Sequence, residues 1–350
     1  MTIRIGVVGV GRVSSLHLDG YATMPDEATV AAVCDVDTDR AAAIGRSYGA
    51  EVLTFEEMLA DPAIDAVEIL VPSPAQPAMA MAAIAAGKHV TVQKPMAGDI
   101  ATAAAIVDSA DAAGVRLRVF ENTVNAPSWR LAERLIADGA IGRPLSIALR
   151  WTNSLQPCGW DVPADSWAWR HLGTWAEQFA APALFDDSAH LLSPAIALFG
   201  EVSEVVALTG RQRIDGRETG FPYALAWHHA GGGQATVDGT LCEDLEVLTE
   251  QYSSDTSLSV TGSAGVLWIN TGEGRVAARP TIEVASGGRL RTHDVDHRWS
   301  AAWAVAQHEW IAALRGEGTY RWTGHEALTV LRGSLLIDAA VRDARRRRAG

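Results

Sequence analysis

The sequence predicts an α/β protein with two domains. The first is a doubly wound parallel sheet, and the second is an α+β domain. Short apolar runs rich in β-branched residues alternate with helical stretches over about the first 120 residues, which is typical of parallel sheets with right-handed crossovers. Beyond that point strand-like runs follow one another with hairpin punctuation, which indicates a large, mostly antiparallel open sheet. We therefore expect two domains, residues 1–122 and residues 123–350, joined without a flexible linker.

The first domain is expected to contain five strands with helices between them. The strands are expected at Ile3–Val8, Thr29–Cys34, Ala66–Val71, His89–Val92 and Arg116–Phe120. The helices are expected at Ser14–Met24, Asp39–Tyr48, Thr54–Ala60, a stretch that ends at Ala86, and Ile100–Ala113. Thr54 with Glu57 has the spacing of a capping box, and Gly87 and Gly114 can adopt the left-handed backbone that ends a helix.

The second domain is expected to open with a helix at Ser128–Asp138 and to close with two helices, Ser300–Leu314 and Gly324–Arg345. The strands between them are expected at Leu145–Thr152, Val202–Thr209, Tyr223–His229, Gln234–Thr240, Leu245–Tyr252, Ser257–Thr261 and Val266–Ile269. Residues 230–233 and 262–265 are glycine-rich and predict tight turns between strands.

Composition narrows the class of protein. The 350 residues carry a formal net charge of −13, which argues against non-specific binding of nucleic acid. The arginines at 345–348 are expected to be a solvated helix end. Three widely spaced cysteines indicate neither a disulfide framework nor a zinc site. The chain enters a strand within three residues and has no long apolar run, so we expect no signal peptide, no membrane span and a cytoplasmic location.

A glycine turn follows the first expected strand. Gly9, Gly11 and Ser14 form a G-x-G-x-x-S pattern that ends a strand and opens a helix, and this context turns a weak motif into evidence for a dinucleotide site. Gly9 allows a tight turn, and Gly11 lets the backbone approach a pyrophosphate. Amide groups at the start of the helix, around Arg12 and Val13, supply the anion site.

Asp35 predicts which dinucleotide binds. It ends the second expected strand, where an acidic side chain bonds the adenosine ribose hydroxyls of NAD. A carboxylate there repels a 2′-phosphate, and Val36 offers no positive charge, so NAD is favoured over NADP. Arg12 and Arg40 are the nearby cations that keep NADP as the less favoured alternative.

Lys94 is placed by the proline that follows it. A proline disfavours the α region for the preceding residue, so Lys94 is expected to be extended at the end of an apolar strand. The carboxyl ends of strands in an open parallel sheet face the ligand crevice. A flexible cation is thereby aimed at the place where a cofactor would lie.

Asp186 and His190 are spaced for one side of a helix, with Asp187 as the expected N-cap. A neutral imidazole can take a proton from an alcohol, and a carboxylate can orient the ring. From spacing alone, a packed or surface histidine is the favoured interpretation of His190. A metal site built from Asp186, Asp187 and His190 is not expected, because the sequence offers no remaining ligands.

These motifs together resemble the Gfo/Idh/MocA family of NAD(P)-dependent oxidoreductases. The resemblance is carried in chain order by the glycine turn, Cys34–Asp37, Ala86–Val90, Gln93–Pro95 and the Asp186-x-x-x-His190 motif. It implies that residues 1–122 bind the dinucleotide and that residues 123–350 bind substrate and form a homodimer or homotetramer. It also implies a hydride transfer between nicotinamide and a secondary hydroxyl or ketone of a sugar, cyclitol or glycoside. In that reaction His190 is the acid–base and Lys94 contacts the reacting oxygen.

The resemblance extends to the individual site residues. The implied cofactor contacts are Gly9, Gly11, Arg12, Val13, Asp35, Val36, Pro72, Ser73, Gln76, Gln93 and Lys94. The implied substrate contacts are Lys94, Glu121, Asn122, Asp186 and His190. We add Trp160 and Trp169 because aromatic faces stack on sugar rings, with packing in the core as the alternative role of these tryptophans.

Several positions depart from the family pattern. Gln93 stands where a glutamate is usual, Gln76 where a histidine is usual, and Ser193 where an aspartate is often found. The substrate pocket is therefore expected to differ from that of inositol dehydrogenase. A redox-neutral NAD-using glycosidase or epimerase-like enzyme, and a non-catalytic NAD-binding regulator, are the alternative functions.

Overall fold

The computed structural model describes residues 2–156, 178–214, 217–249, 253–270 and 274–349. The chain divides into two compact units. Unit 1 contains Met1–Asn122 and Trp303–Leu331, and unit 2 contains Thr123–Ala302 and Arg332–Gly350. The segment Trp303–Leu331 therefore lies with the first unit, whereas the sequence pattern grouped it with the second domain. Its apolar side chains explain this, because Trp310 and Ile311 are buried in the core of unit 1.

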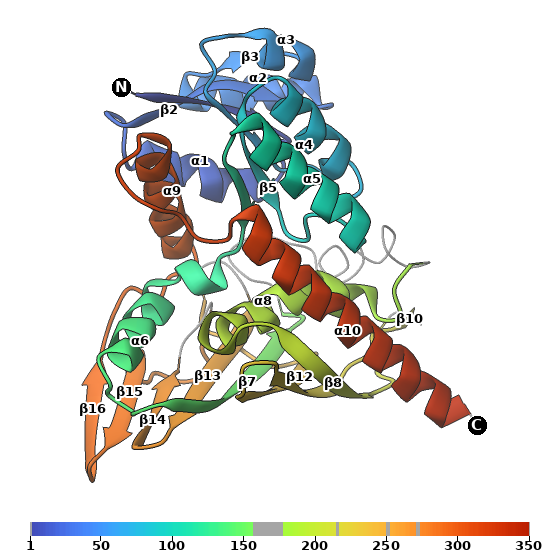
Figure 1. Ribbon diagram of the computed structural model, residues 1–350, viewed down its shortest axis with the longest axis vertical. Coiled ribbons are helices and arrows are strands. Elements are labelled where there is room, and N and C mark those ends of the chain that lie inside the picture. The colour runs from blue at the N-terminus through green and yellow to red at the C-terminus, as the bar shows by residue number, and fades with distance from the viewer. Residues whose placement is uncertain (1, 157–177, 215–216, 250–252, 271–273, 350) are drawn as a thin grey trace. The chain divides into compact units, whose positions relative to one another are not determined.

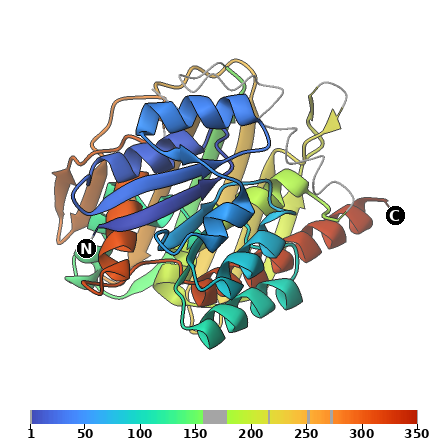
Figure 2. The same ribbon diagram turned by 90° about the horizontal axis from the view of Figure 1, so that it is seen from above.

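Unit 1 is built on a six-stranded sheet in the order β3-β2-β1-β4-β5-β6. Its strands are β1 (Ile3–Val8), β2 (Ala28–Cys34), β3 (Glu51–Val52), β4 (Ala66–Ile69), β5 (His89–Gln93) and β6 (Leu117–Phe120). All neighbouring pairs are parallel, and β1 and β2 run side by side in dark blue in Figure 2. The parallel sheet confirms the predicted fold class. The sequence pattern missed β3, because two exposed residues show no periodicity.

The helices of unit 1 largely follow the predicted order. They are α1 (Ser14–Ala22), α2 (Thr38–Tyr48), α3 (Phe55–Ala60), α4 (Gln76–Ala85) and α5 (Ile100–Ala113), together with nearly all of α9 (Ala301–Leu314) and the start of α10 (Gly324–Ala349). Figure 1 shows α4 and α5 side by side. The capping box at α3 is confirmed, since the Thr54 hydroxyl accepts from Glu57 N and the Glu57 carboxylate accepts from Thr54 N. Gly114 ends α5 in the left-handed conformation.

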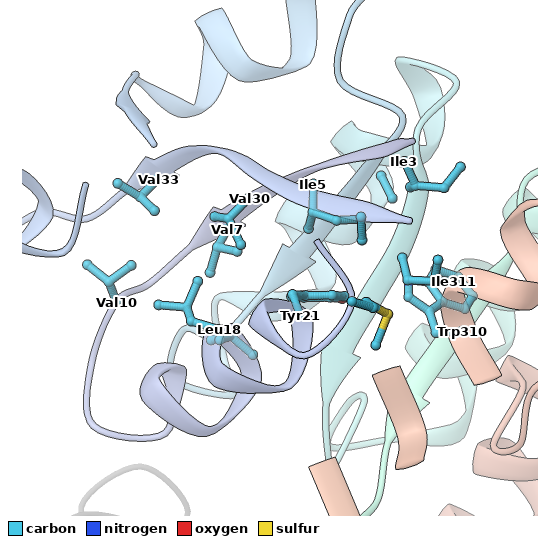
Figure 3. Close-up of a cluster of buried hydrophobic side chains, with 14 of the residues drawn as sticks. Ile3, Ile5, Val7, Val10, Leu18, Tyr21, Val30, Val33, Trp310 and Ile311 are labelled. Atoms are coloured by element: carbon cyan, nitrogen blue, oxygen red, sulfur yellow. The ribbon is translucent and has the colours of Figure 1, made fainter. Parts of the chain in front are cut away.

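The core of unit 1 lies between the sheet and the helices on one of its faces. Side chains of β1 and β2 meet Leu18 and Tyr21 of α1, as Figure 3 shows. Trp310 and Ile311 of α9 close the same cluster. This burial explains why β1 reads as a nearly continuous apolar run, because a parallel strand is covered on both faces.

Unit 2 is built on an eight-stranded sheet in the order β16-β15-β14-β13-β7-β12-β11-β8. The strands are β7 (Pro144–Ser154), β8 (Val202–Thr209), β11 (Tyr223–His229), β12 (Gln234–Cys242), β13 (Ser254–Gly262), β14 (Gly265–Ile269), β15 (Ile282–Ser286) and β16 (Arg289–His293). Every neighbouring pair is antiparallel except β7 with β12. The mostly antiparallel open sheet is confirmed. A separate two-stranded antiparallel sheet pairs β9 (Arg213–Ile214) with β10 (Arg217–Glu218).

The helical elements of unit 2 are η1 (Thr123–Asn125), α6 (Pro127–Ala137), α8 (Pro182–Phe199) and the rest of α10. Burial alternates along β11, where Leu225 and Trp227 are buried while Ala224 and His228 are exposed. This period of two is that of a strand with one covered face.

One predicted strand of unit 2 is absent over its described residues, and one hairpin of its sheet was not predicted. Leu245–Tyr252 is not a strand over its described residues, where Leu248 makes only an isolated bridge to Arg275. The hairpin of β15 and β16 was missed, because β16 is largely exposed and lacks an apolar alternation. Its turn residues Gly287 and Gly288 both have positive φ and were the available signal. Among the described residues no helix combines the length and apolarity needed to cross a membrane.

Candidate active site

The turn between β1 and α1 has the geometry that a dinucleotide site needs. Gly9 has a φ of +87°, and a Cβ there would lie 2.7 Å from the Leu70 carbonyl oxygen, so only glycine fits. Gly11 differs, since its φ is not positive and a Cβ would meet no atom of the described residues within 4 Å apart from its chain neighbours. The space beside Gly11 is therefore not used by the packing of unit 1.

Helix α1 begins without a side-chain cap, although its first turn is anchored. Val13 is the N-cap residue and supplies no capping bond. The Ser14 hydroxyl instead donates to the Gly11 carbonyl oxygen at 2.6 Å. Uncapped N–H groups at a helix start are a site for an anion such as a pyrophosphate.

Asp35 comes directly after β2, and its side chain is only 5% exposed. Its Oδ2 accepts from Val10 N at 2.8 Å, which ties it to the glycine turn, and its Oδ1 accepts from Asp37 N at 2.9 Å. Burial would raise the pKa of Asp35, but these bonds and the Arg40 guanidinium outweigh it and lower the pKa. Asp35 is thus an ionised and fixed carboxylate, while Val36 beside it is fully exposed.

Gln76 is the first residue of α4 and follows the loop that holds Pro72 and Ser73. Its Oε1 accepts from Gln93 N at 2.7 Å, which joins α4 to the end of β5. Its Nε2 is buried and has no hydrogen-bond partner among the described residues. A buried donor without a partner costs free energy unless a ligand or water satisfies it.

Lys94 follows the last residue of β5 and is partly exposed, and its peptide bond to Pro95 is cis. Because every strand of this sheet is parallel, Lys94 shares the carboxyl edge with the glycine turn and Asp35. Glu121 and Asn122 follow β6 at the same edge and are buried. The predicted residues of unit 1 are therefore collected at one edge of one sheet.

A buried polar network adjoins Gln93 and was not found from the sequence. His17 of α1 is completely buried, with Nδ1 2.9 Å from Glu68 Oε1 and Nε2 2.7 Å from Gln93 Nε2. Because a carboxylate only accepts, the His17 Nδ1 proton is donated to Glu68, and Nε2 then accepts from the Gln93 amide. Burial would raise the pKa of Glu68, but His17 and Arg118 lower it. The available signal was a glutamate inside the otherwise apolar strand Ala66–Ile69.

Asp186 and His190 lie on α8 in unit 2, one helical turn apart. Asp186 is buried, and the His190 ring stacks on buried Trp151 with ring centroids 5.9 Å apart and an angle of 19° between the planes. The expectation that Asp187 is an N-cap is wrong, because α8 already begins at Pro182 with Ala181 as its N-cap. The helix starts earlier because proline is well tolerated in a first turn.

Trp160 and Trp169, which we expected to contact substrate, lie outside the described residues. Trp151 is described, and its Nε1 donates to Asn153 Oδ1 at 2.8 Å within the covered face of the sheet. No group of three or more histidine, cysteine, aspartate or glutamate side chains suited to a metal ion occurs within the described part of the chain.

The residues of unit 1 fit a bound dinucleotide. The unused space beside Gly11 and the uncapped start of α1 suit a pyrophosphate, and the fixed carboxylate of Asp35 suits a ribose diol. The unpaired Gln76 Nε2 offers a further donor near the end of β5.

Comparison with known proteins agrees with this geometry. A family model described as an oxidoreductase family with an NAD-binding Rossmann fold matches residues 3–121, and the model of the GFO/IDH/MocA C-terminal domain matches residues 129–268. Inositol 2-dehydrogenase 3 of Saccharopolyspora erythraea is 32% identical over 342 residues, which cover 94% of this chain and 91% of that protein. D-apiose dehydrogenase of Paraburkholderia graminis is 28% identical over 355 residues, covering 97% and 87%.

Solved structures share the fold over nearly the whole chain. An NAD-binding oxidoreductase from Klebsiella pneumoniae has a TM-score of 0.79 at 23% identity and covers 97% of this chain and 96% of its own. The WlbA dehydrogenase from Bordetella pertussis, in complex with NADH and UDP-GlcNAcA, has a TM-score of 0.76 at 23% identity and covers 98% and 96%.

Fold and site together define an oxidoreductase with an NAD-binding Rossmann domain. The chain belongs to the Gfo/Idh/MocA family, whose two domain models account for most of its length. The resemblance seen in the sequence motifs is confirmed.

Proposed function

We propose that this protein is an NAD-dependent dehydrogenase that transfers a hydride between nicotinamide and a secondary hydroxyl or ketone of a sugar, cyclitol or glycoside. The observation that carries the proposal is the position of Lys94 at the carboxyl edge of the parallel sheet that also holds the glycine turn and Asp35. The relatives that are named inositol 2-dehydrogenase and D-apiose dehydrogenase support the substrate class.

In the oxidation, the substrate C–OH becomes C=O and loses a proton and a hydride. His190 takes the hydroxyl proton, and Asp186, one turn before it on α8, holds the ring orientation together with the stacked Trp151. The Lys94 ammonium stabilises the negative charge that develops on the substrate oxygen. The chemistry that NAD supplies when bound is acceptance of the hydride with its two electrons. In the reverse direction His190 returns the proton to the oxygen.

NAD is the preferred cofactor because Asp35 is ionised where the adenosine ribose would lie. We place the protein in the cytoplasm, supported by the free thiols of Cys34 and Cys242. Exposed Val206 and Leu208 on the edge strand β8 support the association of this sheet with a second copy, which sedimentation of the purified chain tests.

The test is a panel of sugars, cyclitols and glycosides followed by NADH absorbance. On the substrate that is found, His190→Ala and Lys94→Met are each expected to lower kcat by about 10²–10⁴-fold, since each removes one partner of the proton and charge chemistry. His325→Ala is the matched control, because the His325 side chain is exposed and its ring contacts Asp111 at the surface of unit 1.

Full turnover by both variants would refute the assigned roles. Substrate turnover without net NADH would instead favour the redox-neutral alternative, and NADH binding that is indifferent to every compound would favour a regulatory protein.

A further inference from the structure

Arg40 is bound to the carboxylate that the dinucleotide would need. From the first turn of α2, its Nη2 donates to Asp35 Oδ1 at 2.7 Å, and its Nε lies 3.4 Å from Asp35 Oδ2. Its remaining nitrogen, Nη1, is 3.3 Å from Asp37 Oδ2. The guanidinium is therefore shared between two carboxylates while 45% of the side chain remains exposed.

This arrangement is held from several sides. Asp35 is fixed by the backbone N–H groups of Val10 and Asp37 as well as by Arg40. Asp37 caps α2 by accepting from Arg40 N at 3.0 Å, so the backbone that carries Arg40 is anchored too. The Arg40 side chain thus needs no large backbone movement to bind either a carboxylate or another anion at this position.

Charge decides what the position accepts. Asp35, Asp37 and Arg40 together carry a net charge of −1, and Val36 between the carboxylates is apolar and fully exposed. A 2′-phosphate placed here would meet two carboxylates and a guanidinium that is already paired with both of them. Without the Asp35 charge, the same planar guanidinium would be available for bidentate binding of a phosphate.

We propose that Arg40 is a cofactor-specificity residue: paired with Asp35 it positions the carboxylate for the ribose diol of NAD, and once Asp35 loses its charge it becomes a ligand for the 2′-phosphate of NADP. The proposal rests on the dinucleotide assignment above but not on the roles of Lys94 and His190. Arg40 acts on NAD through Asp35 and is in that state a positioning residue.

The experiment measures the dissociation constants of NADH and NADPH by nicotinamide fluorescence on the full chain, with no substrate present. The variants are Asp35→Ser, Arg40→Met and the double variant, with Arg46→Ala as a control that removes a positive charge from the other end of the same helix. Arg40→Met is expected to weaken NADH binding severalfold. Asp35→Ser is expected to weaken NADH and strengthen NADPH, and adding Arg40→Met is expected to remove the gain in NADPH affinity, by about tenfold or more.

If Arg40 had only a structural role, Arg40→Met would lower the NADH and NADPH affinities together. The proposal instead requires Arg40→Met to shift the ratio of NADPH affinity to NADH affinity upward in the wild-type protein and downward in Asp35→Ser. Asp35→Asn, which keeps an acceptor oxygen for Val10 N, replaces Asp35→Ser if that variant unfolds.

Restored NADPH binding in Asp35→Ser/Arg40→Lys, with a steep salt dependence, would support the phosphate contact. The proposal is overturned if the double variant binds NADPH as tightly as Asp35→Ser does. Normal cofactor binding with no dehydrogenase turnover would refute the proposed function. The test of Arg40 would still hold, because it measures only cofactor affinity.

Discussion

Lys94 is one of only two lysines in the chain, and the other, Lys88, has a structural role. Lys88 is buried, and its Nζ donates to the carbonyl oxygens of Asp61 and Ile64 at 2.6 and 2.8 Å. A buried lysine is retained only where such acceptors satisfy it. The two lysines therefore differ in accessibility, which makes Lys94 selectively addressable.

Trace labelling with an amine-reactive reagent is expected to modify Lys94 well before Lys88, as read by peptide mass spectrometry. Saturating NAD is expected to slow the labelling of Lys94, because we place it beside the nicotinamide, and to leave labelling of the amino terminus unchanged. Equal labelling of Lys94 with and without NAD would contradict its place in the cofactor site.

At the scale of single residues, spacing along the sequence predicted the position of a side chain where the backbone alone determines that position. Asp35 was predicted as a ribose contact from its place at a set distance from the glycine turn, and the structure shows a fixed, ionised carboxylate directly after β2, which is compatible with that prediction. Its clamp by Arg40 depends on a side-chain conformation, which spacing does not determine. The network of His17 and Glu68 was missed for the same reason, since its members come from separate elements.

At the scale of elements, the two glycines of the turn between β1 and α1 differ in what constrains them. Glycine is required at position 9 by its positive φ and by the nearby Leu70 carbonyl, whereas Gly11 borders space that none of the described residues fills. The two glycines of one motif thus serve different purposes.

Gly9→Ala is expected to destabilise the protein by at least about 2 kcal/mol, because it adds left-handed strain to a steric clash. Gly11→Ala is expected to change stability by less than about 0.5 kcal/mol, yet to weaken NADH binding about tenfold by blocking the pyrophosphate. Thermal melting and NADH titration of both variants test this. Unaltered NADH binding by Gly11→Ala would show that the dinucleotide does not pass there.

Elements with a strong period were predicted closely, and weak ones were not. β1, β8, β11 and α5 have the predicted bounds, because their apolar period or their glycine ends are unambiguous. β3 and β16 are short or exposed and depend on a neighbouring strand for their existence, so their own residues carry little signal.

At the scale of the whole molecule, unit 1 is held together by a buried polar centre made from distant segments. Arg118 of β6 donates to Glu68 of β4 at 3.3 Å, and to Gln307 Oε1 and the Ala306 carbonyl oxygen of α9 at 2.6 and 2.8 Å. Its guanidinium also lies 4.9 Å from the ring centroid of Trp310. These contacts bind the segment Trp303–Leu331 into the first unit.

Glu68→Gln is expected to destabilise the protein by about 3 kcal/mol at neutral pH, because it leaves the buried Arg118 charge without its carboxylate. The folded pKa of Glu68 is lowered, so its stabilisation is complete above the unfolded glutamate pKa of about 4.3 and is lost as the pH falls through the lower folded pKa. Urea unfolding should therefore show that the difference in unfolding free energy between Glu68→Gln and the wild type shrinks as the pH falls through that acid range.

Glu56→Gln is the matched control, since Glu56 is exposed on α3. It is expected to change the free energy of unfolding by less than about 0.5 kcal/mol. A Glu68→Gln variant as stable as the wild type at neutral pH would show that Glu68 contributes no net stability.

The sequence by itself determined the parallel sheet, the open antiparallel sheet, the glycine turn with Asp35 near it along the chain, and the family, because these depend on local periods and on residues at fixed distances along the chain. Only the tertiary structure decided that Trp303–Leu331 completes unit 1, that Arg40 pairs with Asp35, and that His17 connects Glu68 to Gln93. Those contacts join residues far apart in the chain or depend on side-chain rotamers, and neither is encoded in a local pattern.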